Sequence, residues 1–587
     1  MKKTVIAIVL AAGMFASCKK VLDIEDINSY KPEQVWNDEN LANAYIANIY
    51  TVFGNWSPSE DRFSEQVIGI ALPKDLILTN NGNFKLWDYG RIRLINQAII
   101  DVQKGNLRQA AKESITAQAL FLRAYIYFRM VMYHGGVPYL KVPQDRFTDD
   151  LYIPRNSTAE CFDLIIKDID DAIALLPEYN TPTSADYGKI DDMFALAFKA
   201  KVLLYKASPQ FHSSNPWNNT DWAAAYTANK KAYDDLKAKG FKLVDDYANI
   251  TIVERGPETV FPVINQYPSK VTNWDNGVRP GSESRGPASA VPTWEFIKAF
   301  PMKDGKLYND PTSAYHKTEA VFQQSYWENR DPRFNKAIVW NGKNYPVSGK
   351  TNKRLYTMLG IADPLDDFGT NPAAAVNSSN MDRYSGFFIL KNSLLRLTGA
   401  QVLQYDVDFV LMRFAEVMLN YAETANETGR INEAMDILKA IRQRAGIEPG
   451  VDGNYGIVAT TREQMREAIL NERNIELCFE GHRFWDLRRL RMLSKLNNTT
   501  KYGLEAITIE ANGTDMDLRK AAGLAAANSL TESNFRYVLQ QVPRTGVKVN
   551  TVPDTYYFFP LHRDWIDRNP KLVQNKDWGG TFVPTLD

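Results

Sequence analysis

Apolar residues recur at helical spacing over long stretches of the chain, and this periodicity constrains the fold more than any other feature. In residues 87–104, Ile92, Ile95 and Ile99 return every three or four positions, which marks one buried face of a helix. Ser157 and Glu160 have the spacing of a capping box ahead of another such segment. The pattern predicts a mostly α-helical protein with further helices in residues 115–133, 157–176, 193–207, 222–239, 410–424 and 431–444.

Two of these segments form a pair around a short turn. Residues 410–424 contain Ala and Tyr at helical spacing, residues 427–430 include Gly429, and Ala434 lies near the start of the next helix. This order resembles a tetratricopeptide repeat, in which each unit is a pair of antiparallel helices. The pairs are irregular and separated by insertions, so we expect a divergent repeat array. An ordinary antiparallel helical hairpin is the alternative.

The residue composition and the predicted secondary structure change between residues 241 and 407. Pro, Gly, Asn and Ser cluster in residues 266–292 and 363–380, between short strand-like pieces. A loop-rich stretch of this length inside a compact protein is usually functional. We therefore expect a helical region over residues 18–240, a loop-rich insertion with the ligand-site loops over 241–407, and a C-terminal region with a further helical hairpin over 408–587.

The first residues have the features of a targeting segment. Lys2 and Lys3 precede an uncharged apolar run over residues 4–14, which is too short for the ~20 residues of a membrane-spanning helix. Small residues then lead into Cys18, which resembles the lipobox of bacterial lipoproteins. That resemblance implies a signal peptide over residues 1–17, acylation of Cys18 and a tethered protein. An ordinary secretory signal with an incidental cysteine is the alternative.

The sequence contains no positive signal for catalysis, a cofactor or a metal. Lys plus Arg and Asp plus Glu are both 69, so the net charge is zero and there is little electrostatic drive for binding nucleic acid. The common hydrolase, zinc and calcium motifs are missing, and the five histidines do not have metal-ligand spacing. Paired carboxylates of a glycosidase are defined by separation in space, so this class stays open.

Charged residues crowd the segment 472–489, which could be mistaken for an active site. Apolar residues at helical spacing run through the same segment. We therefore interpret Glu476, Arg483 and Asp486 as an ion-pair network that clamps helix ends, and not as catalytic groups.

Several motifs, taken in order, resemble the SusD/RagB family of outer-membrane nutrient-binding lipoproteins of Bacteroidota. Each motif is short, but their number and order extend over nearly the whole chain after the leader. They lie at residues 121–125, 133–138, 292–293, 300–305, 413–423, 472–488, 557–560, 569–570 and 574–575.

The resemblance implies both a fold and a function. The family has an α-helical body of four divergent tetratricopeptide-like hairpins, with a loop-rich part packed against it. Its members bind oligosaccharides or other nutrients at the cell surface and are not enzymes. They work with a SusC-like TonB-dependent outer-membrane transporter, over whose mouth they sit like a lid. Peptide binding, a repeat scaffold and a surface glycoside hydrolase are the alternatives.

Two loop-rich stretches are predicted to carry the ligand site, because they combine aromatic rings with polar neighbours. Rings can stack on the C–H face of a sugar, and polar groups can bond to its hydroxyls. Trp274 lies in no periodic pattern, so we expect its ring outside the core, whereas Trp294 is expected inside it. The predicted ligand-binding residues are Asp75, Asn83, Trp87, Tyr267, Asn273, Trp274 and Arg279. For Trp87, packing at the start of its helix is an equal alternative.

Overall fold

The computed structural model describes residues 31–57, 60–69, 84–286, 288–352, 354–358, 385–542 and 552–587. Cys18 and the rest of the predicted leader lie outside these residues. The described part is mostly helical, which confirms the predicted fold class. Its longer helices are α3 (Glu39–Ile49), α4 (Tyr89–Lys104), α5 (Gln109–His134), α6 (Thr158–Ile173), α7 (Asp192–Ala207), α8 (Asp221–Ala238), α14 (Phe414–Glu427), α15 (Ile431–Ala445), α16 (Arg462–Glu476), α17 (Arg483–Arg489) and α18 (Leu518–Ala526). The shorter helices are α2 (Pro32–Val35), α9 (Trp274–Val278), α10 (Trp294–Ala299), α11 (Glu319–Gln324), α12 (Pro332–Ala337) and α19 (Arg563–Arg568).

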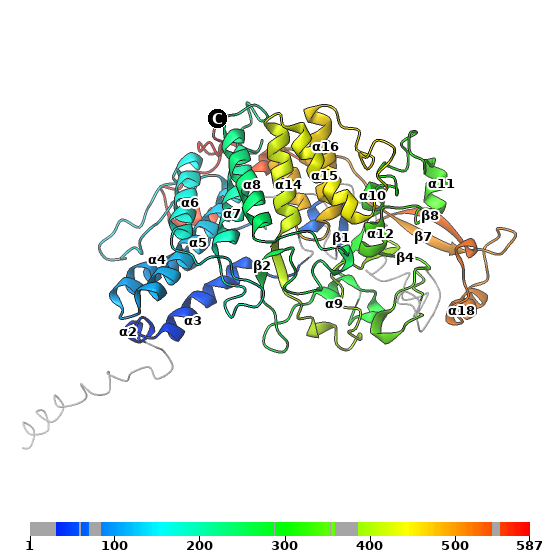
Figure 1. Ribbon diagram of the computed structural model, residues 1–587, viewed down its shortest axis with the longest axis horizontal. Coiled ribbons are helices and arrows are strands. Elements are labelled where there is room, and N and C mark those ends of the chain that lie inside the picture. The colour runs from blue at the N-terminus through cyan, green and yellow to red at the C-terminus, as the bar shows by residue number, and fades with distance from the viewer. Residues whose placement is uncertain are drawn as a thin grey trace, which may run out of the picture.

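The long helices form a row in which neighbours along the chain pack side by side (Figure 1). Helices α4 to α8 make the first part of the row, and α8 then packs against α14, which continues it through α15 and α16. Helix α5 is buried along most of its length because it has neighbours on several sides. The row is the tetratricopeptide-like body that the sequence predicts.

Local sequence signals set the ends of these helices. The Ser157 side chain caps α6 by accepting from the N–H of Glu160, and the Glu160 carboxylate accepts from the N–H of Ser157 at 2.8 Å, so the predicted capping box is confirmed. Between α14 and α15, Gly429 has a φ of +81°, a conformation that costs glycine little. This glycine closes the predicted turn between the two helices.

A second layer of short strands and loops packs against the helical body. The antiparallel pairs are β1 (Val67–Gly69) with β3 (Ala290–Pro292), β2 (Thr259–Val263) with β6 (Phe409–Arg413), β4 (Ile338–Trp340) with β5 (Phe387–Ile389), and β7 (Tyr502–Thr508) with β8 (Phe535–Gln541). Trp294 is fully buried in the core of this layer, as predicted. The β7–β8 hairpin joins the same core, although it follows α17 in sequence.

A buried cluster of charges connects the two layers through Glu476. Its carboxylate lies 2.8 Å from the guanidinium of Arg413 and 3.0 Å from that of Arg333, and it also pairs with Arg444. Burial acts to raise the pKa of Glu476, but the three guanidinium groups together lower it well below its ordinary value. Glu476 is therefore an anion that holds β6, α12 and α15 around the end of α16.

The other two residues of the predicted network are also ion-paired, but with different partners. Asp486 lies 2.8 Å from Arg473 and 2.9 Å from Arg489, whereas Arg483 pairs with Glu65. The interpretation of segment 472–489 as structural ion pairs is therefore confirmed. The idea of one network in which Glu476, Arg483 and Asp486 meet is wrong, because no ion pair joins any two of them and each has its own partners.

Residues 552–587 fold back over the first helices. The N–H of Phe559 donates to the carbonyl oxygen of Tyr133 at 2.7 Å, and the N–H of Leu586 donates to that of Phe211 at 2.7 Å. The hydroxyl of Thr158 donates to the carbonyl oxygen of Pro584 at 2.8 Å. These bonds cover the end of α5 and the start of α6.

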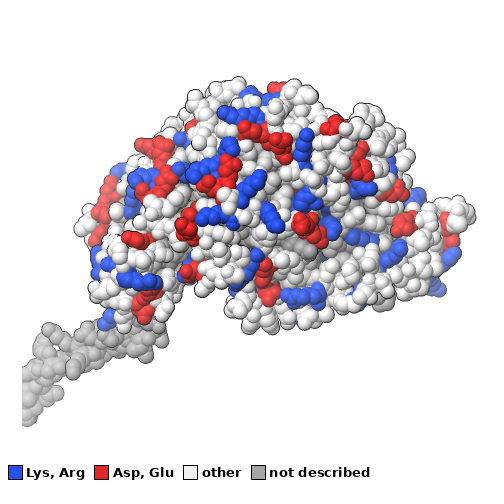
Figure 2. All heavy atoms as spheres, in the orientation of Figure 1, with Lys and Arg blue, Asp and Glu red and all other residues white. Residues whose placement is uncertain are grey.

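The charges on the molecular surface are mixed. Figure 2 shows Lys and Arg interspersed with Asp and Glu over the face in view, without a broad patch of one sign. In the described ranges no helix is long and apolar enough to span a bilayer.

Candidate ligand-binding site

A cavity of about 240 Å³ lies where the helical body meets the second layer. Its walls come from α5 and α7, from residues 53–57 with Glu60, from β6, and from residues around the start of α17, namely 479–482 and 485. Aromatic rings make up much of the lining, namely Phe53, Trp56, Tyr125, Phe128, Tyr133, Phe194, Phe198, Tyr205, Phe409, Phe479 and Trp485. Flat aromatic surfaces therefore form a large part of the cavity wall, beside polar and charged side chains.

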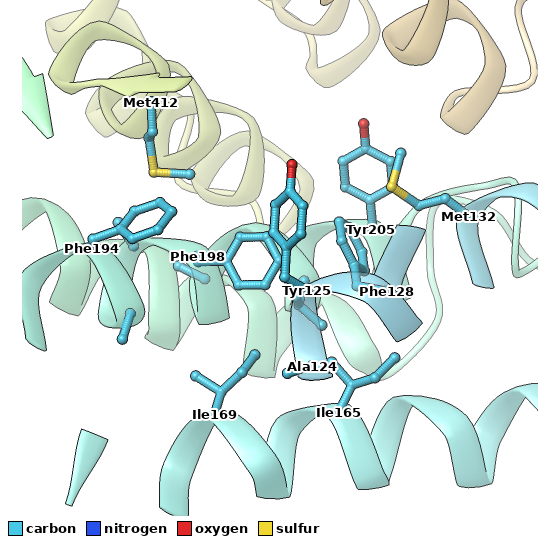
Figure 3. Close-up of a cluster of buried hydrophobic side chains, with 14 of the residues drawn as sticks. Ala124, Tyr125, Phe128, Met132, Ile165, Ile169, Phe194, Phe198, Tyr205 and Met412 are labelled. Carbon is cyan, nitrogen blue, oxygen red and sulfur yellow. The ribbon is translucent and has the colours of Figure 1, made fainter. Parts of the chain in front are cut away.

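The floor of the cavity is a cluster of rings on two neighbouring helices (Figure 3). The ring of Phe198 of α7 packs against those of Tyr125 and Phe128 of α5, with ring centroids 5.3 and 5.4 Å away. Phe128 also meets Tyr205 edge to face at 5.2 Å. Residues three or four positions apart share one helix face, so each helix presents a strip of rings to the cavity.

Two tyrosine hydroxyls face the cavity without a partner. Figure 3 shows the hydroxyls of Tyr125 and Tyr205 pointing away from Ile165 and Ile169 of α6, which lie on the other side of the cluster. Neither hydroxyl forms a hydrogen bond with a described residue, and both residues line the cavity. Burial raises the pKa of both groups, so each hydroxyl keeps its proton and can donate it to a ligand.

Charged side chains of both signs stand around the rings. The indole N–H of Trp485 donates to the Glu60 carboxylate at 2.5 Å. The Arg129 guanidinium donates to the carbonyl oxygen of Val52 at 3.5 Å. Among the described residues, Glu60 and Arg129 have no partner of opposite charge within ion-pair distance. Both side chains are thus available for hydrogen bonds to a bound molecule.

A second charged group at the cavity centres on Glu416, which is fully buried. Its carboxylate lies 2.8 Å from the ammonium of Lys201 and 3.9 Å from Nε2 of His482. Lys201 and His482 both line the cavity. Burial lowers the pKa of His482, so its ring is mainly neutral at pH 7. This side of the cavity carries one ammonium group whose charge Glu416 balances.

Asp61, beside Glu60, is fully buried next to this site. Neither of its carboxyl oxygens has a hydrogen-bond partner among the described residues, and the N–H of Gly481 faces the group without reaching hydrogen-bond geometry. Burial, together with the nearby charge of Glu60, raises the pKa of Asp61 to about 8. At pH 7 the group is therefore mainly a neutral carboxylic acid.

The arrangement suits a polar molecule that has apolar faces. Rings supply stacking surfaces, while tyrosine hydroxyls and unpaired charges supply hydrogen bonds inside a low-dielectric space. The described residues contain no cluster of metal-ligating side chains.

The structure corrects the prediction for Trp274. Its ring is 1% exposed and packs 5.3 Å from the ring of Trp56, so it belongs to the second core and offers no free face to a sugar. Its short helix α9 explains this, because the buried Asp275 pairs with Arg279 one turn later at 2.7 Å and fixes the helix against the core. Arg279 is equally buried, so it too is structural here. Trp274 reaches the cavity only indirectly, as the support behind Trp56.

Other predicted site residues lie apart from the cavity. Tyr267 is 50% exposed, and Asn273 is exposed as well, so both are accessible to a ligand. Trp87 stacks on Trp565 with ring centroids 4.6 Å apart, a packing role that matches the alternative given for it. Asp75 and Asn83 lie outside the described residues.

The residues of the cavity itself were missed by the sequence analysis. Tyr125, Arg129 and Tyr133 occupy every fourth position of α5 and so share one face. These three side chains with polar tips on one face of α5 are a sequence signal that could have indicated this site. His482 and Trp485 were assigned a structural role, yet both line the cavity.

A row of paired helices packed against a loop-rich layer defines a helical-repeat protein, with an aromatic cavity where the two layers meet. A family model described as the SusD family matches residues 257–578, and a model described as starch-binding associating with outer membrane matches residues 74–204. The chain belongs to the SusD family, which confirms the resemblance drawn from its motifs.

Relatives of known sequence or structure agree with this assignment. A SusD-like protein of Formosa agariphila is 24% identical over 530 residues, which cover 84% of this chain and 93% of the relative. A SusD-like protein of Bacteroides fragilis superposes with a TM-score of 0.70 at 23% identity, covering 92% of this chain and 98% of the other. A structure named as a SusD-like carbohydrate binding protein, also from Bacteroides fragilis, gives 0.69 at 19% identity, covering 92% and 100%. At these identities the structural likeness establishes the fold.

Proposed function

We propose that this protein binds a nutrient oligosaccharide at the outer face of the outer membrane and passes it unchanged to a SusC-like TonB-dependent transporter. The observation that carries the proposal is the aromatic cavity with its two tyrosine hydroxyls, neither of which bonds to another described residue. A sugar ring presents C–H faces that stack on aromatic rings, and hydroxyls that bond to Tyr, Glu and Arg. The carbohydrate-binding relative with the same fold supports this choice of ligand.

The carboxylates of the cavity support binding without hydrolysis. Glu60 and Glu480 are the two that line it. Burial acts to raise the pKa of Glu480, but the charges of Arg413 and Lys391 lower it to about 2. A group with that pKa cannot serve as the general acid that glycoside cleavage requires near neutral pH. Asp61 is protonated, but it does not line the cavity.

The proposal also covers where sugar units outside the cavity bind and how the protein is held on the membrane. Tyr267 and Asn273 are exposed and suited to contact sugar units outside the cavity. Acylation at Cys18 would hold the protein on the membrane, which agrees with the family description of association with the outer membrane. A protein tethered in this way can act as a lid over a transporter.

Affinity electrophoresis in gels containing soluble starch, laminarin, xylan or mucin tests the binding. We expect at least one polymer to retard the protein, and no release of reducing sugar from that polymer over a day. Absence of retardation by all of them would contradict glycan binding, and reducing-sugar release would contradict a non-catalytic role. Detergent extraction of native membranes should recover a TonB-dependent barrel with the protein.

A further inference from the structure

We infer that residues 141–153, a loop in the connection between α5 and α6, insert apolar side chains into the surface of the lipid bilayer to which the protein is anchored. The inference rests on the anchoring part of the proposed function, because the tether brings the loop to the membrane. It adds a second contact with lipid, separate from Cys18. Three observations carry it: the exposed apolar side chains of the loop, the bonds that fix its shape, and its position relative to the anchored end of the chain.

A cluster of exposed apolar side chains lies on this loop. Phe147 is 81% exposed, which makes its ring the most exposed aromatic ring among the described residues. Val142, Leu151 and Tyr152 of the same loop are exposed as well. Single exposed apolar side chains are normal on a protein surface, but a cluster of them marks a site of interaction.

Hydrogen bonds within the loop fix its shape. The N–H of Phe147 donates to the Asp145 carboxylate at 2.8 Å, and the N–H of Asp149 donates to the carbonyl oxygen of Asp145 at 3.0 Å. The N–H of Asp145 donates in turn to the Asp149 carboxylate at 2.7 Å. The backbone therefore closes on itself beneath Phe147, and the ring is held out in solvent by an ordered turn.

Both ends of the loop are bound to the body of the protein. The Arg93 guanidinium of α4 donates to the carbonyl oxygen of Gln144 at 2.6 Å, and the ammonium of Lys571 lies 2.6 Å from the Asp150 carboxylate. Between these points the loop projects at the edge of the molecule, on the side where α2 and α4 lie (Figure 1). The apolar side chains thus stand on a protrusion whose base is fixed.

The anchor keeps the bilayer within reach of this protrusion. The chain from Cys18 to Lys31, the first described residue, spans at most ~45 Å when fully extended. Beyond the end of α4, the N–H of Asn106 donates to the side-chain oxygen of Asn37, which follows α2, at 2.9 Å. The loop meets α4 near its start, at Arg93. These two points lie ~20 Å apart along the helix, so the tether is long enough for the loop to touch the surface that holds the acyl chains.

A bilayer suits this loop better than a protein partner does. A stable protein interface usually takes ~20–30 residues on each side, whereas the loop offers four apolar side chains on a protrusion. Lipid headgroups rearrange around such a protrusion, and Phe, Leu and Tyr favour the boundary between headgroups and acyl chains. Asp145, Arg146 and Asp149 carry charges of both signs and can stay among the hydrated headgroups, so a neutral lipid is sufficient. The contact fixes how the tethered body is oriented on the membrane.

The first test places an environment-sensitive dye on the loop. Phe147→Cys is labelled in a chain that starts at Lys19 and carries an N-terminal His tag, while Cys161 and Cys478 are buried and stay unlabelled. Phosphatidylcholine vesicles that contain some nickel-chelating lipid then replace the acyl anchor. On tethering, the emission should rise and shift to the blue, and imidazole should reverse both changes.

Val458→Cys is the matched control for the dye. Val458 is also exposed, but it lies on the segment before α16, at the other end of the helical row, so its emission should not change. Unchanged emission at position 147 in the tethered protein would overturn the inference. A change that occurs only with the co-extracted barrel, and not with vesicles, would overturn it as well, because the occupant would then be a protein.

The second test removes the apolar side chains. The double variant Phe147→Ser, Leu151→Ser should melt like the wild type, because both side chains are exposed, while its binding to the same vesicles should weaken at least ~tenfold. The control is Val451→Ser, Val458→Ser, which removes two exposed side chains elsewhere. Equal vesicle binding by the loop variant and the control would contradict the inference.

These tests fail separately from the proposed function. The vesicle experiments contain no glycan and supply the tether artificially, so they depend neither on sugar binding nor on acylation of Cys18. A wild-type protein that no polymer retards would overturn the proposed glycan binding and leave the membrane contact standing. The loop variant should still be retarded like the wild type, because its substitutions lie outside the cavity.

Discussion

The neutral acid at Asp61 makes a quantitative prediction about pH. Its pKa is raised to about 8 in the folded protein, mainly by burial, from an ordinary value of 3.8. Between these values the folded state holds a proton that the unfolded state has lost. The free energy of unfolding therefore falls as pH rises, by ~1.4 kcal/mol per pH unit. This loss of stability is absent below about pH 4, where both states are protonated, and complete above about pH 8, where both are ionised.

Asp61→Asn removes this dependence, because an amide of similar shape does not titrate. The free energy of unfolding of the variant, relative to that of the wild type, should therefore rise by about 3 kcal/mol between pH 5 and pH 7.5. For a chain of this length, that corresponds to roughly 2.5 °C in melting temperature, given ~2.1 cal/mol/K per residue of unfolding entropy. Other titrating groups change equally in both proteins and cancel in the difference.

Differential scanning calorimetry gives the melting temperature of both proteins at pH 5 and pH 7.5. The predicted quantity is the change, between these pH values, in the difference between variant and wild type. Asp245→Asn is the control, because that aspartate is exposed and should show no such gain. If the difference in melting temperature between variant and wild type were the same at pH 5 and pH 7.5, the argument from burial would fail.

Three further predictions concern other parts of the chain. Trp274→Ala should cost about 3–5 kcal/mol of stability, because it empties a core position; an unchanged melting curve would contradict the burial of this ring. Glu476→Gln should cost a similar ~3–5 kcal/mol, since it leaves three buried guanidinium groups without their shared anion; the same calorimetry checks it. Cys18→Ala should move the protein from the membrane fraction to the supernatant, and unchanged fractionation would refute lipidation at this position.

The helical body could be predicted because its signals are local. Apolar spacing, the Ser157 capping box and the turn at Gly429 each depend on residues a few positions apart. Family motifs then supplied the overall arrangement. The prediction that segment 472–489 forms structural ion pairs was right, but the predicted partners were wrong. Glu476 binds arginines up to 143 positions away, which local spacing does not indicate.

The candidate ligand site could not be predicted in the same way. Trp274 has no periodic neighbours, yet contact with Trp56, far away in sequence, buries it. A short irregular segment gives no local sign of whether tertiary packing covers it. The cavity, in turn, forms between α5, α7, β6 and residues 53–57, so its existence depends on how distant elements meet. The spacing of Tyr125, Arg129 and Tyr133 on α5 was a local signal for it, which the sequence analysis did not use.

The return of residues 552–587 over α5 affects the order in which the protein can fold. Tyr133 and Thr158 obtain backbone and side-chain partners from residues synthesised more than 400 positions later. Contacts between such distant residues form slowly, because a long loop must close first. The first helices can form early, but they cannot complete their hydrogen bonding while the chain is still growing. A protein exported before it folds would benefit from this delay, since the native state is reached only when residues 552–587 arrive.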